Sequence, residues 1–358
     1  MIHGYKTIFP IPLAESSSWD LELMENSARV AAREASADGL HWTFAPMVDI
    51  SRDARWGRVM EGAGEDSYLG SLVAKARVRG FQGNDLNDIN TIVACAKHFA
   101  GYGFSEAGRD YNTTDFNQFT LHNTIMPPFK AAVDAGVRTF MNSFNTLDEI
   151  PATGHKHIQR NILKGDWGFD GFIVSDWGSI EQMIPHGFAR DGNHAAELAV
   201  IAGSDMDMES SLYVSELVGL VKSGKVNIEL IDDAVRRILR VKYELGLFDD
   251  PYKYCNITRS NNELASDENM KVALEAAKKL NDQNISTDII FIMTKPKGPS
   301  ISGTHFQFLT GKGGKGNVSL TVDESRRFVH IAKQLVNCAN WEKKVDQEAV
   351  LKVAKVIE

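Results

Sequence analysis

The chain has 358 residues, of which 43% are hydrophobic and 24% are charged, as in ordinary globular proteins. Its 39 basic and 47 acidic residues leave a formal net charge of −8, which disfavours binding to nucleic acid or to an anionic membrane. We therefore expect a soluble chain with a sizeable core, long enough for one barrel of about 250 residues and a smaller unit.

Signals for metal binding, membrane insertion and secretion are not seen in the sequence. Cys95, Cys255 and Cys338 lie too far apart for a zinc motif or a disulfide framework. His155 and His157 have the spacing of two strand ligands, but no third ligand is near. We expect no metal, no cofactor, no membrane span and no signal peptide in the chain as given, and the compartment stays open.

Helical patterns alternate with short apolar runs over residues 1–250, which indicates βα units and a parallel sheet. A helix is predicted from the capping residues Ser17 and Asp20 to a stop at Gly39. An amphipathic helix is predicted from Asn227 to Phe248. Four runs read as strands, at residues 42–48, 91–96, 139–142 and 172–175.

Polar residues follow these strands repeatedly. Asp49, Lys97, His98, Asn145 and Asp176 are all expected just past strand ends, where parallel barrels build their active sites. An open doubly wound sheet would also collect ligand groups there, but no GxGxxG motif follows a strand. We therefore predict an α/β fold with a TIM-like (β/α) barrel over residues 1–250.

The remaining chain changes character. Residues 251–281 are predicted to be a linker with one helix at 262–279, and residues 282–358 a small α+β tail. In this tail we expect a strand at 288–293, a hairpin from 306–310 and 317–322, and helices from Asp323 and over 343–357. The Gly-Lys turn of the hairpin lacks the ending of a phosphate-binding loop.

Asp176 and Trp177 end a buried strand with a carboxylate beside an indole. A carboxylate at a barrel mouth can attack an anomeric carbon, and an aromatic ring can supply an apolar face for a sugar. Taken alone, the motif is equally compatible with Asp176 capping the following helix.

Several long motifs, in order, resemble glycoside hydrolase family 3, in particular its β-glucosidase branch. The nucleophile motif Gly-Phe-Ile-Val-Ser-Asp-Trp-Gly occupies residues 171–178. Arg-Asp-Ala-Arg-Trp-Gly-Arg lies at 52–58, Glu-Gly-Ala-Gly-Glu-Asp at 61–66 and Lys-His-Phe-Ala-Gly-Tyr-Gly at 97–103. Residues 237–248 resemble the end of the family's first domain. The resemblance covers residues 1 to about 280, and the tail is not recognised.

The resemblance implies a role for each matching polar residue. Asp176 would be the nucleophile of a retaining mechanism, which forms a covalent glycosyl-enzyme that water then hydrolyses. Lys97 and His98 would bind sugar hydroxyls in the −1 subsite, and Arg58 another hydroxyl, with Glu61 orienting this basic cluster. Sugars need such a dense set of donors, and fixed cations strengthen their bonds as charge develops.

The resemblance also implies walls for this subsite. Met141 and Trp177 match residues that line it, and Phe144 stands where many relatives have a tyrosine. Two questions stay open. Either Arg55 or Arg58 binds substrate while the other packs on an aromatic ring or pairs with an acid, and Asp49 either points into the site or orders a loop.

The chain departs from the family pattern at its start. Relatives carry an Asp before the Ile-His-Gly motif, but here Met1 precedes it, so we expect a barrel without its usual first strand and helix. Such an opening exposes a sheet edge. The apolar run at 288–293 is a candidate to fill it.

A second departure concerns the general acid/base. The family's acid/base Glu lies in a second domain that is not recognised after Lys279. Three alternatives remain for the acid: a tail carboxylate such as Asp323 or Glu324, a residue of a partner subunit, or no acid at all. We favour the last. The loop 103–111 carries no His, unlike the N-acetylglucosamine-specific branch.

We therefore predict a retaining hydrolase of terminal β-D-glucosyl or related β-glycosyl residues, weak because protonation of the leaving group is typically worth about 10²- to 10⁴-fold in rate. The expected partner is a β-glycoside or oligosaccharide, and a homo-oligomer is compatible with the sequence. The alternatives are a catalytically impaired sugar-binding protein or an N-acetyl-β-hexosaminidase.

Overall fold

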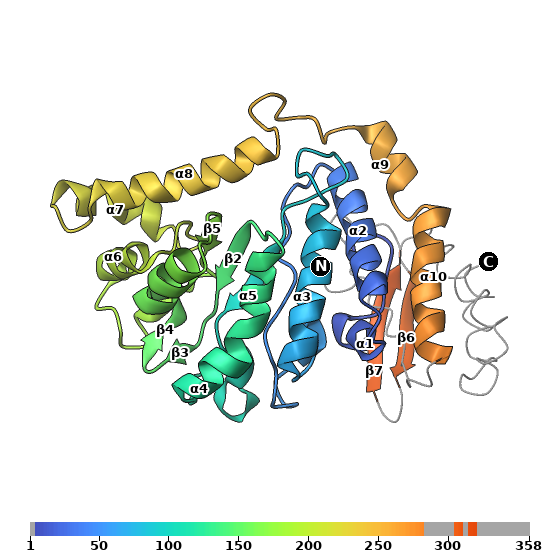
Figure 1. Cartoon of the computed structure of the whole chain (residues 1–358), viewed down its shortest axis with the longest axis horizontal. Coiled ribbons are helices and arrows are strands. Elements are labelled where there is room, and N and C mark those ends of the chain that lie inside the picture. Colours follow the sequence, from blue (N-terminus) through green and yellow to red (C-terminus); the bar gives the residue numbers. More distant parts are fainter. Residues whose placement is uncertain (1–3, 283–303, 311–313, 321–358) are drawn as a thin grey trace.

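The computed structural model describes residues 4–282, 304–310 and 314–320 (Figure 1). The α-helices are α1 (Pro12–Ser17), α2 (Leu21–Ala37), α3 (Ser67–Gln82), α4 (Gln118–Thr120), α5 (Met126–Asp134), α6 (Gly192–Ala202), α7 (Leu212–Lys222), α8 (Ile228–Glu244), α9 (Ile257–Glu263) and α10 (Asp267–Asp282). The strands are β1 (Cys95–Phe99), β2 (Thr139–Asn142), β3 (Thr146–Leu147), β4 (Ile150–Pro151), β5 (Phe172–Val174), β6 (Thr304–Thr310) and β7 (Gly314–Leu320). The helix η6 (His157–Asp166) has π geometry.

A parallel sheet in the order β1-β2-β5 lies at the centre of the fold. Isolated parallel bridges continue it at both edges, from Trp42 to Val93 and Met47 to Lys97, and from Val174 to Met206. This is the predicted TIM-like α/β arrangement, although the strands of the described residues do not close into a barrel.

The two faces of the sheet contribute to two separate cores. Phe99, Phe140 and Ile173 face α2, α3 and α5, which lie side by side in Figure 1, and pack with side chains such as Phe129 of α5. Cys95, Met141, Phe172 and Val174 alternate with them and pack against Val241, Leu245 and Tyr254. Both faces are therefore buried, as parallel sheets require.

The structure corrects several predicted strand bounds. Residues 42–48 form only two isolated bridges, at Trp42 and Met47. Backbone hydrogen bonds nevertheless join this segment to β1, from Lys97 N–H to the Pro46 carbonyl and from Val48 N–H to the Lys97 carbonyl. Lys97 and His98 lie inside β1 and not past its end. Asn145 is buried and donates to the Ala100 carbonyl, so it holds the loop after β2.

The helices are also corrected at their ends. Asp20 caps α2 by accepting the N–H of Leu23, as expected, whereas Ser17 ends α1. Asn227 caps α8, which ends at Glu244 and not at Phe248. The single helix predicted at 262–279 is two, because α9 and α10 are separated at residues 264–266, where Ala265 has a positive φ of 46°.

The predicted hairpin of the tail is present. Strands β6 and β7 pair antiparallel, from Thr304 opposite Leu320 to Thr310 opposite Gly314. The predicted strand at 288–293, the two predicted tail helices and the acid candidates Asp323 and Glu324 lie outside the described residues.

Candidate active site

Asp176 lies two residues after β5 ends, and its backbone is held by the neighbouring segment 205–208. The N–H groups of Ser175 and Gly178 donate to the carbonyls of Met206 and Met208, at 2.8 and 2.9 Å. The Met208 N–H donates to Ser175 Oγ at 2.8 Å. The backbone is thus fixed on both sides of Asp176, and the side chain of this residue is 11% exposed.

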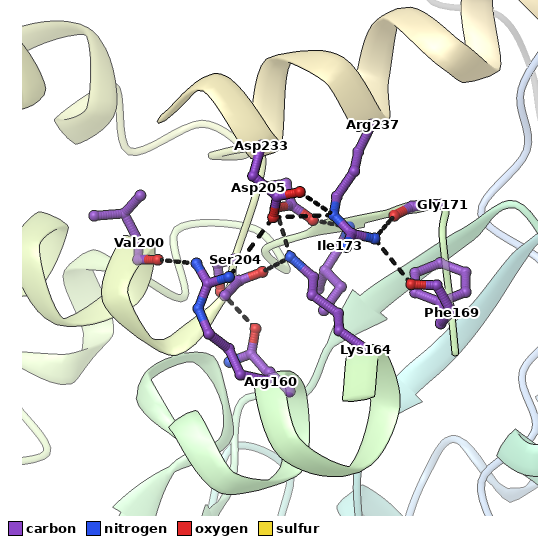
Figure 2. Close-up of polar contacts among 12 residues, drawn as sticks. Arg160, Lys164, Phe169, Gly171, Ile173, Val200, Ser204, Asp205, Asp233 and Arg237 are labelled. Carbon is purple, nitrogen blue, oxygen red and sulfur yellow. Dashed lines mark hydrogen bonds and ion pairs between the residues drawn. The ribbon is translucent and has the colours of Figure 1, made fainter. Parts of the chain in front are cut away.

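A buried ion pair anchors this segment to β5 (Figure 2). Lys164 Nζ of η6 donates to Asp205 Oδ1 at 2.6 Å and to the Gly203 carbonyl at 2.8 Å. Asp205 Oδ2 accepts the N–H of Ile173 at 2.8 Å. Arg237 of α8 donates to the carbonyls of Phe169 and Gly171, just before β5. These contacts fix the strand that leads to Asp176.

His98 lies between two carboxylates. Its Nδ1 is 2.8 Å from Asp49 Oδ2, and its Nε2 is 3.5 Å from Asp176 Oδ2. Asp49, left open by the sequence, therefore points into the site, where its side chain and that of His98 are each 1% exposed. Asp176 Oδ2 and Asp49 Oδ1 are buried without a hydrogen-bond partner.

Two cations join this group through one acid. Arg58 donates to both oxygens of Glu61, from Nε at 2.8 Å and from an Nη at 3.1 Å, and Lys97 Nζ lies 3.4 Å from Glu61 Oε2. Arg55, in contrast, pairs with Asp53 and is exposed. Arg58 therefore belongs to the cluster with Glu61 and Lys97, and Arg55 does not.

Burial controls the protonation of the two carboxyls beside His98. It raises the pKa of Asp176 to about 6, while the Trp177 N–H and the cations Arg58 and Lys97 oppose the rise. Burial likewise raises the pKa of Asp49 to about 7, again against the N–H of His98 and the same cations. Burial thus disfavours the charged form of both carboxyls.

The same surroundings shift the pKa values of three basic and acidic neighbours. Burial lowers the pKa of His98 well below its usual value, and Lys97 and Arg58 add to this. Burial opposes ionisation of Glu61, but the hydrogen bonds and charges of Arg58 and Lys97 outweigh it and lower that pKa. Burial would also lower the pKa of Arg58, but the pair with Glu61 raises it. Hence Arg58 and Glu61 stay charged at neutral pH.

Aromatic side chains line the site behind these groups. Tyr102, which the sequence analysis did not single out, packs edge to face on His98 and contacts Phe144, and the Arg58 guanidinium lies 5.6 Å from its ring centroid. Its place in the 97–103 motif could have indicated it. Trp177 is 63% exposed, whereas Met141 is buried in the sheet with Cys95 and Val174.

The structure thus brings together Arg58, Glu61, Lys97, His98 and Asp176, which the sequence predicted, and adds Asp49 and Tyr102. Among the described residues, no group of three or more His, Cys, Asp or Glu could hold a metal ion, and His155 with His157 is no exception. A buried carboxylate with fixed donors beside it has the groups needed to bind a ligand with several hydroxyls and to attack an electrophilic carbon in it.

Comparison with known proteins identifies the family. Residues 1–241 match the model of the glycosyl hydrolase family 3 N terminal domain. The chain is 46% identical over 254 residues to a periplasmic beta-glucosidase of Salmonella typhimurium, covering 71% of this chain and 33% of that relative. It is 36% identical over 302 residues to a beta-xylosidase of Formosa agariphila, covering 79% of this chain and 41% of that relative.

A solved structure agrees with these relatives. The crystal structure of a beta-glucosidase from Listeria innocua in complex with isofagomine aligns with a TM-score of 0.77 at 45% identity, covering 78% of this chain and 39% of that one. The chain therefore spans 33% to 41% of the length of these relatives. With the family model matched over residues 1–241, the chain belongs to glycosyl hydrolase family 3.

Proposed function

We propose that the chain forms the nucleophile-bearing part of a retaining β-glycosidase that acts on terminal β-D-glucosyl or related β-glycosyl residues. One observation carries this proposal: the buried Asp176 carboxylate has one oxygen without a partner, 3.5 Å from His98 Nε2, beside the Arg58–Glu61–Lys97 cluster. A free carboxylate oxygen among fixed donors is what a covalent glycosidase mechanism needs.

In the first step, an electron pair of Asp176 Oδ2 forms a bond to the anomeric carbon while the bond from that carbon to the leaving oxygen breaks. In the second step, water attacks the same carbon, the ester bond to Asp176 breaks, and the water's extra proton is released to solvent or to a base. Two displacements return the original β configuration. The positive charges of Arg58 and Lys97 keep Asp176 ionised against its burial.

The remaining predicted residues have supporting places in this proposal. Arg58, Lys97 and His98 would bind sugar hydroxyls, and Glu61 would fix the two cations. Trp177, with its exposed ring, would offer an apolar face to the sugar or the leaving group. Met141 and Phe144, both buried, would shape the site from behind.

Protonation of the leaving group limits the range of substrates. Three carboxylates near Asp176 each have a hydrogen-bond partner: Asp49 accepts from His98, Glu61 binds Arg58, and Asp110 accepts from Trp56 Nε1 at 2.9 Å. We therefore expect the chain by itself to cleave activated aryl β-glycosides and to act weakly on alkyl or sugar leaving groups, which depend more on an acid.

None of the described helices has the length and apolar character of a membrane span.

The stereochemistry of an aryl β-glucoside's hydrolysis tests this proposal. Proton NMR during the first minutes should show the β anomer of the sugar before mutarotation. The Asp176→Ala variant should lose turnover and still bind sugar, whereas Asp170→Ala, an exposed aspartate before β5, should keep turnover. First formation of the α anomer would refute the mechanism. A wild-type chain that binds sugar without turnover would instead indicate a sugar-binding protein.

A further inference from the structure

Asp49 contacts His98 through a single oxygen. Asp49 Oδ2 accepts the backbone N–H of His98 at 2.9 Å and lies 2.8 Å from its Nδ1. Both side chains are 1% exposed, so water does not compete for these contacts. The carboxylate therefore holds the backbone and the ring of one residue at once.

This geometry fixes where the ring proton sits. An ionised Asp49 can only accept hydrogen bonds, so Nδ1, at 2.8 Å from Oδ2, is then the donor. If Asp49 itself takes up a proton, its other oxygen, Oδ1, has no partner and is free to carry it. With the acid proton on Oδ1, Oδ2 still accepts from Nδ1, and the proton of a neutral ring stays on Nδ1.

The charged surroundings favour a neutral ring. Lys97 adjoins His98 in β1, and Arg58 reaches it from the loop that precedes Glu61; both lower its pKa in addition to burial. Asp49 and Asp176 face it from the other elements, and the Tyr102 ring packs against it edge to face. When Nδ1 carries the ring proton and donates a hydrogen bond to Asp49, Nε2 of the neutral ring has a lone pair and no proton.

Nε2 and Asp176 Oδ2 are then two acceptors that face each other. Their separation of 3.5 Å is longer than a normal N–H···O bond, and Asp176 Oδ2 has no hydrogen-bond partner. A group placed beside both must itself bring a proton, as a sugar hydroxyl does. The hydroxyl can donate to Nε2 and leave the lone pairs of Asp176 free.

We propose that Asp49 is a positioning residue that holds His98 in its Nδ1–H tautomer, so that Nε2 accepts a hydrogen bond from a substrate hydroxyl and does not donate one to the nucleophile. The identity of the ligand, a β-glycoside, rests on the proposed function. The assignment of the tautomer is independent of that function. The lone pairs of Asp176 stay available for reaction because His98 has no N–H at Nε2 to donate to them.

Nitrogen-15 NMR of the chain labelled at its 10 histidines tests the tautomer without any need for turnover. The signals of His98 are assigned by their loss in His98→Gln. We expect an Nδ1–H pattern that does not titrate between pH 6 and 8. An Nε2–H pattern, or a doubly protonated ring in that range, would overturn the proposal.

Two variants of Asp49 separate its hydrogen bond from its charge. Asp49→Asn can place its amide oxygen where Oδ2 lies and should keep the Nδ1–H pattern. Asp49→Leu removes the acceptor and should give a mixture of tautomers or the Nε2–H form. An unchanged pattern in Asp49→Leu, or a changed one in Asp49→Asn, contradicts the role of that oxygen. If Asp49→Leu does not fold, the wild-type spectrum and Asp49→Asn still decide.

Kinetics connect the tautomer to the substrate. With an aryl β-glucoside, Asp49→Leu should lower kcat/KM at least about tenfold, the size expected for one buried hydrogen bond, and Asp49→Asn should lower it less. Equal losses in the two variants would mean that charge, not the tautomer, matters. An Nδ1–H pattern in a chain without turnover would refute the proposed function and leave the assignment of the tautomer intact.

Discussion

Replacing the proposed nucleophile, Asp176→Asn, should stabilise the folded protein above pH 6. Burial raises the pKa of Asp176 from 3.8 to about 6, so the folded state prefers the protonated carboxyl. The stabilisation from this proton is fully present below pH 3.8 and is lost as the pH rises through 6. An asparagine imitates the protonated form at every pH. Its amide can also donate to His98 Nε2, the acceptor inferred above.

The size of the effect follows from the pKa shift. A rise of about two pH units corresponds to about 3 kcal/mol, at about 1.4 kcal/mol per unit. The variant should exceed the wild type by about 1 kcal/mol in free energy of unfolding at pH 4.5 and by about 3 kcal/mol at pH 8. Because Asp176 retains slight exposure, these values are upper estimates.

Urea unfolding at the two pH values measures this difference. Asp170→Asn is the matched control, since Asp170 is exposed and pairs with Arg138 at 2.7 Å. The control should lose less than about 1 kcal/mol, in the opposite direction. If Asp176→Asn is no more stable than the wild type at pH 8, or if its advantage does not grow with pH, burial does not disfavour the charged form of the Asp176 carboxylate.

Other predictions concern the ion pair, the pH profile and the aromatic wall. Lys164→Met should cost about 3–5 kcal/mol in urea unfolding because it strands a buried acid, and the exposed Lys130→Met should cost less than about 1; equal costs would contradict the anchoring role. Below about pH 6, kcat/KM should fall tenfold per pH unit as Asp176 is protonated. Lys97→Met removes a charge that lowers the pKa of Asp176, so the fall in kcat/KM should begin at a higher pH. An unchanged pH profile would refute the electrostatic coupling. Trp177→Ala should raise KM about two- to tenfold and leave the urea midpoint unchanged, because the ring is 63% exposed, and the reverse result would make the ring structural.

Much of the site could be predicted from the sequence because its residues occupy contiguous motifs. Asp176, His98 and Arg58 each lie in such a motif, and the structure brings all three motifs to one place. The role of Asp49 stayed open, because a single aspartate after an apolar run does not indicate whether it faces the site. Only the 2.8 Å contact with His98 resolves it.

Contacts between residues far apart in the chain could not be predicted from the sequence. Lys164 and Asp205 lie 41 residues apart, and nothing in the spacing predicted the buried pair that anchors β5 (Figure 2). The bounds of one predicted strand were also wrong, because residues 42–48 pair with their neighbour only through two isolated bridges, which an apolar run does not distinguish from a regular strand. The break between α9 and α10 has a similar local origin, since Ala265 adopts a positive φ within a helical pattern.

Covalent trapping of Asp176 tests the central claim most directly. A 2-deoxy-2-fluoro-β-glucosyl fluoride has a leaving group that needs little protonation, so a chain without an acid can still form the glycosyl-enzyme. The mass of the chain should increase by one fluoroglucosyl group, located on the peptide that contains Asp176, and Asp176→Asn should gain none. A label on another carboxylate, or no label on a chain that hydrolyses aryl β-glucosides, would contradict Asp176 as the nucleophile.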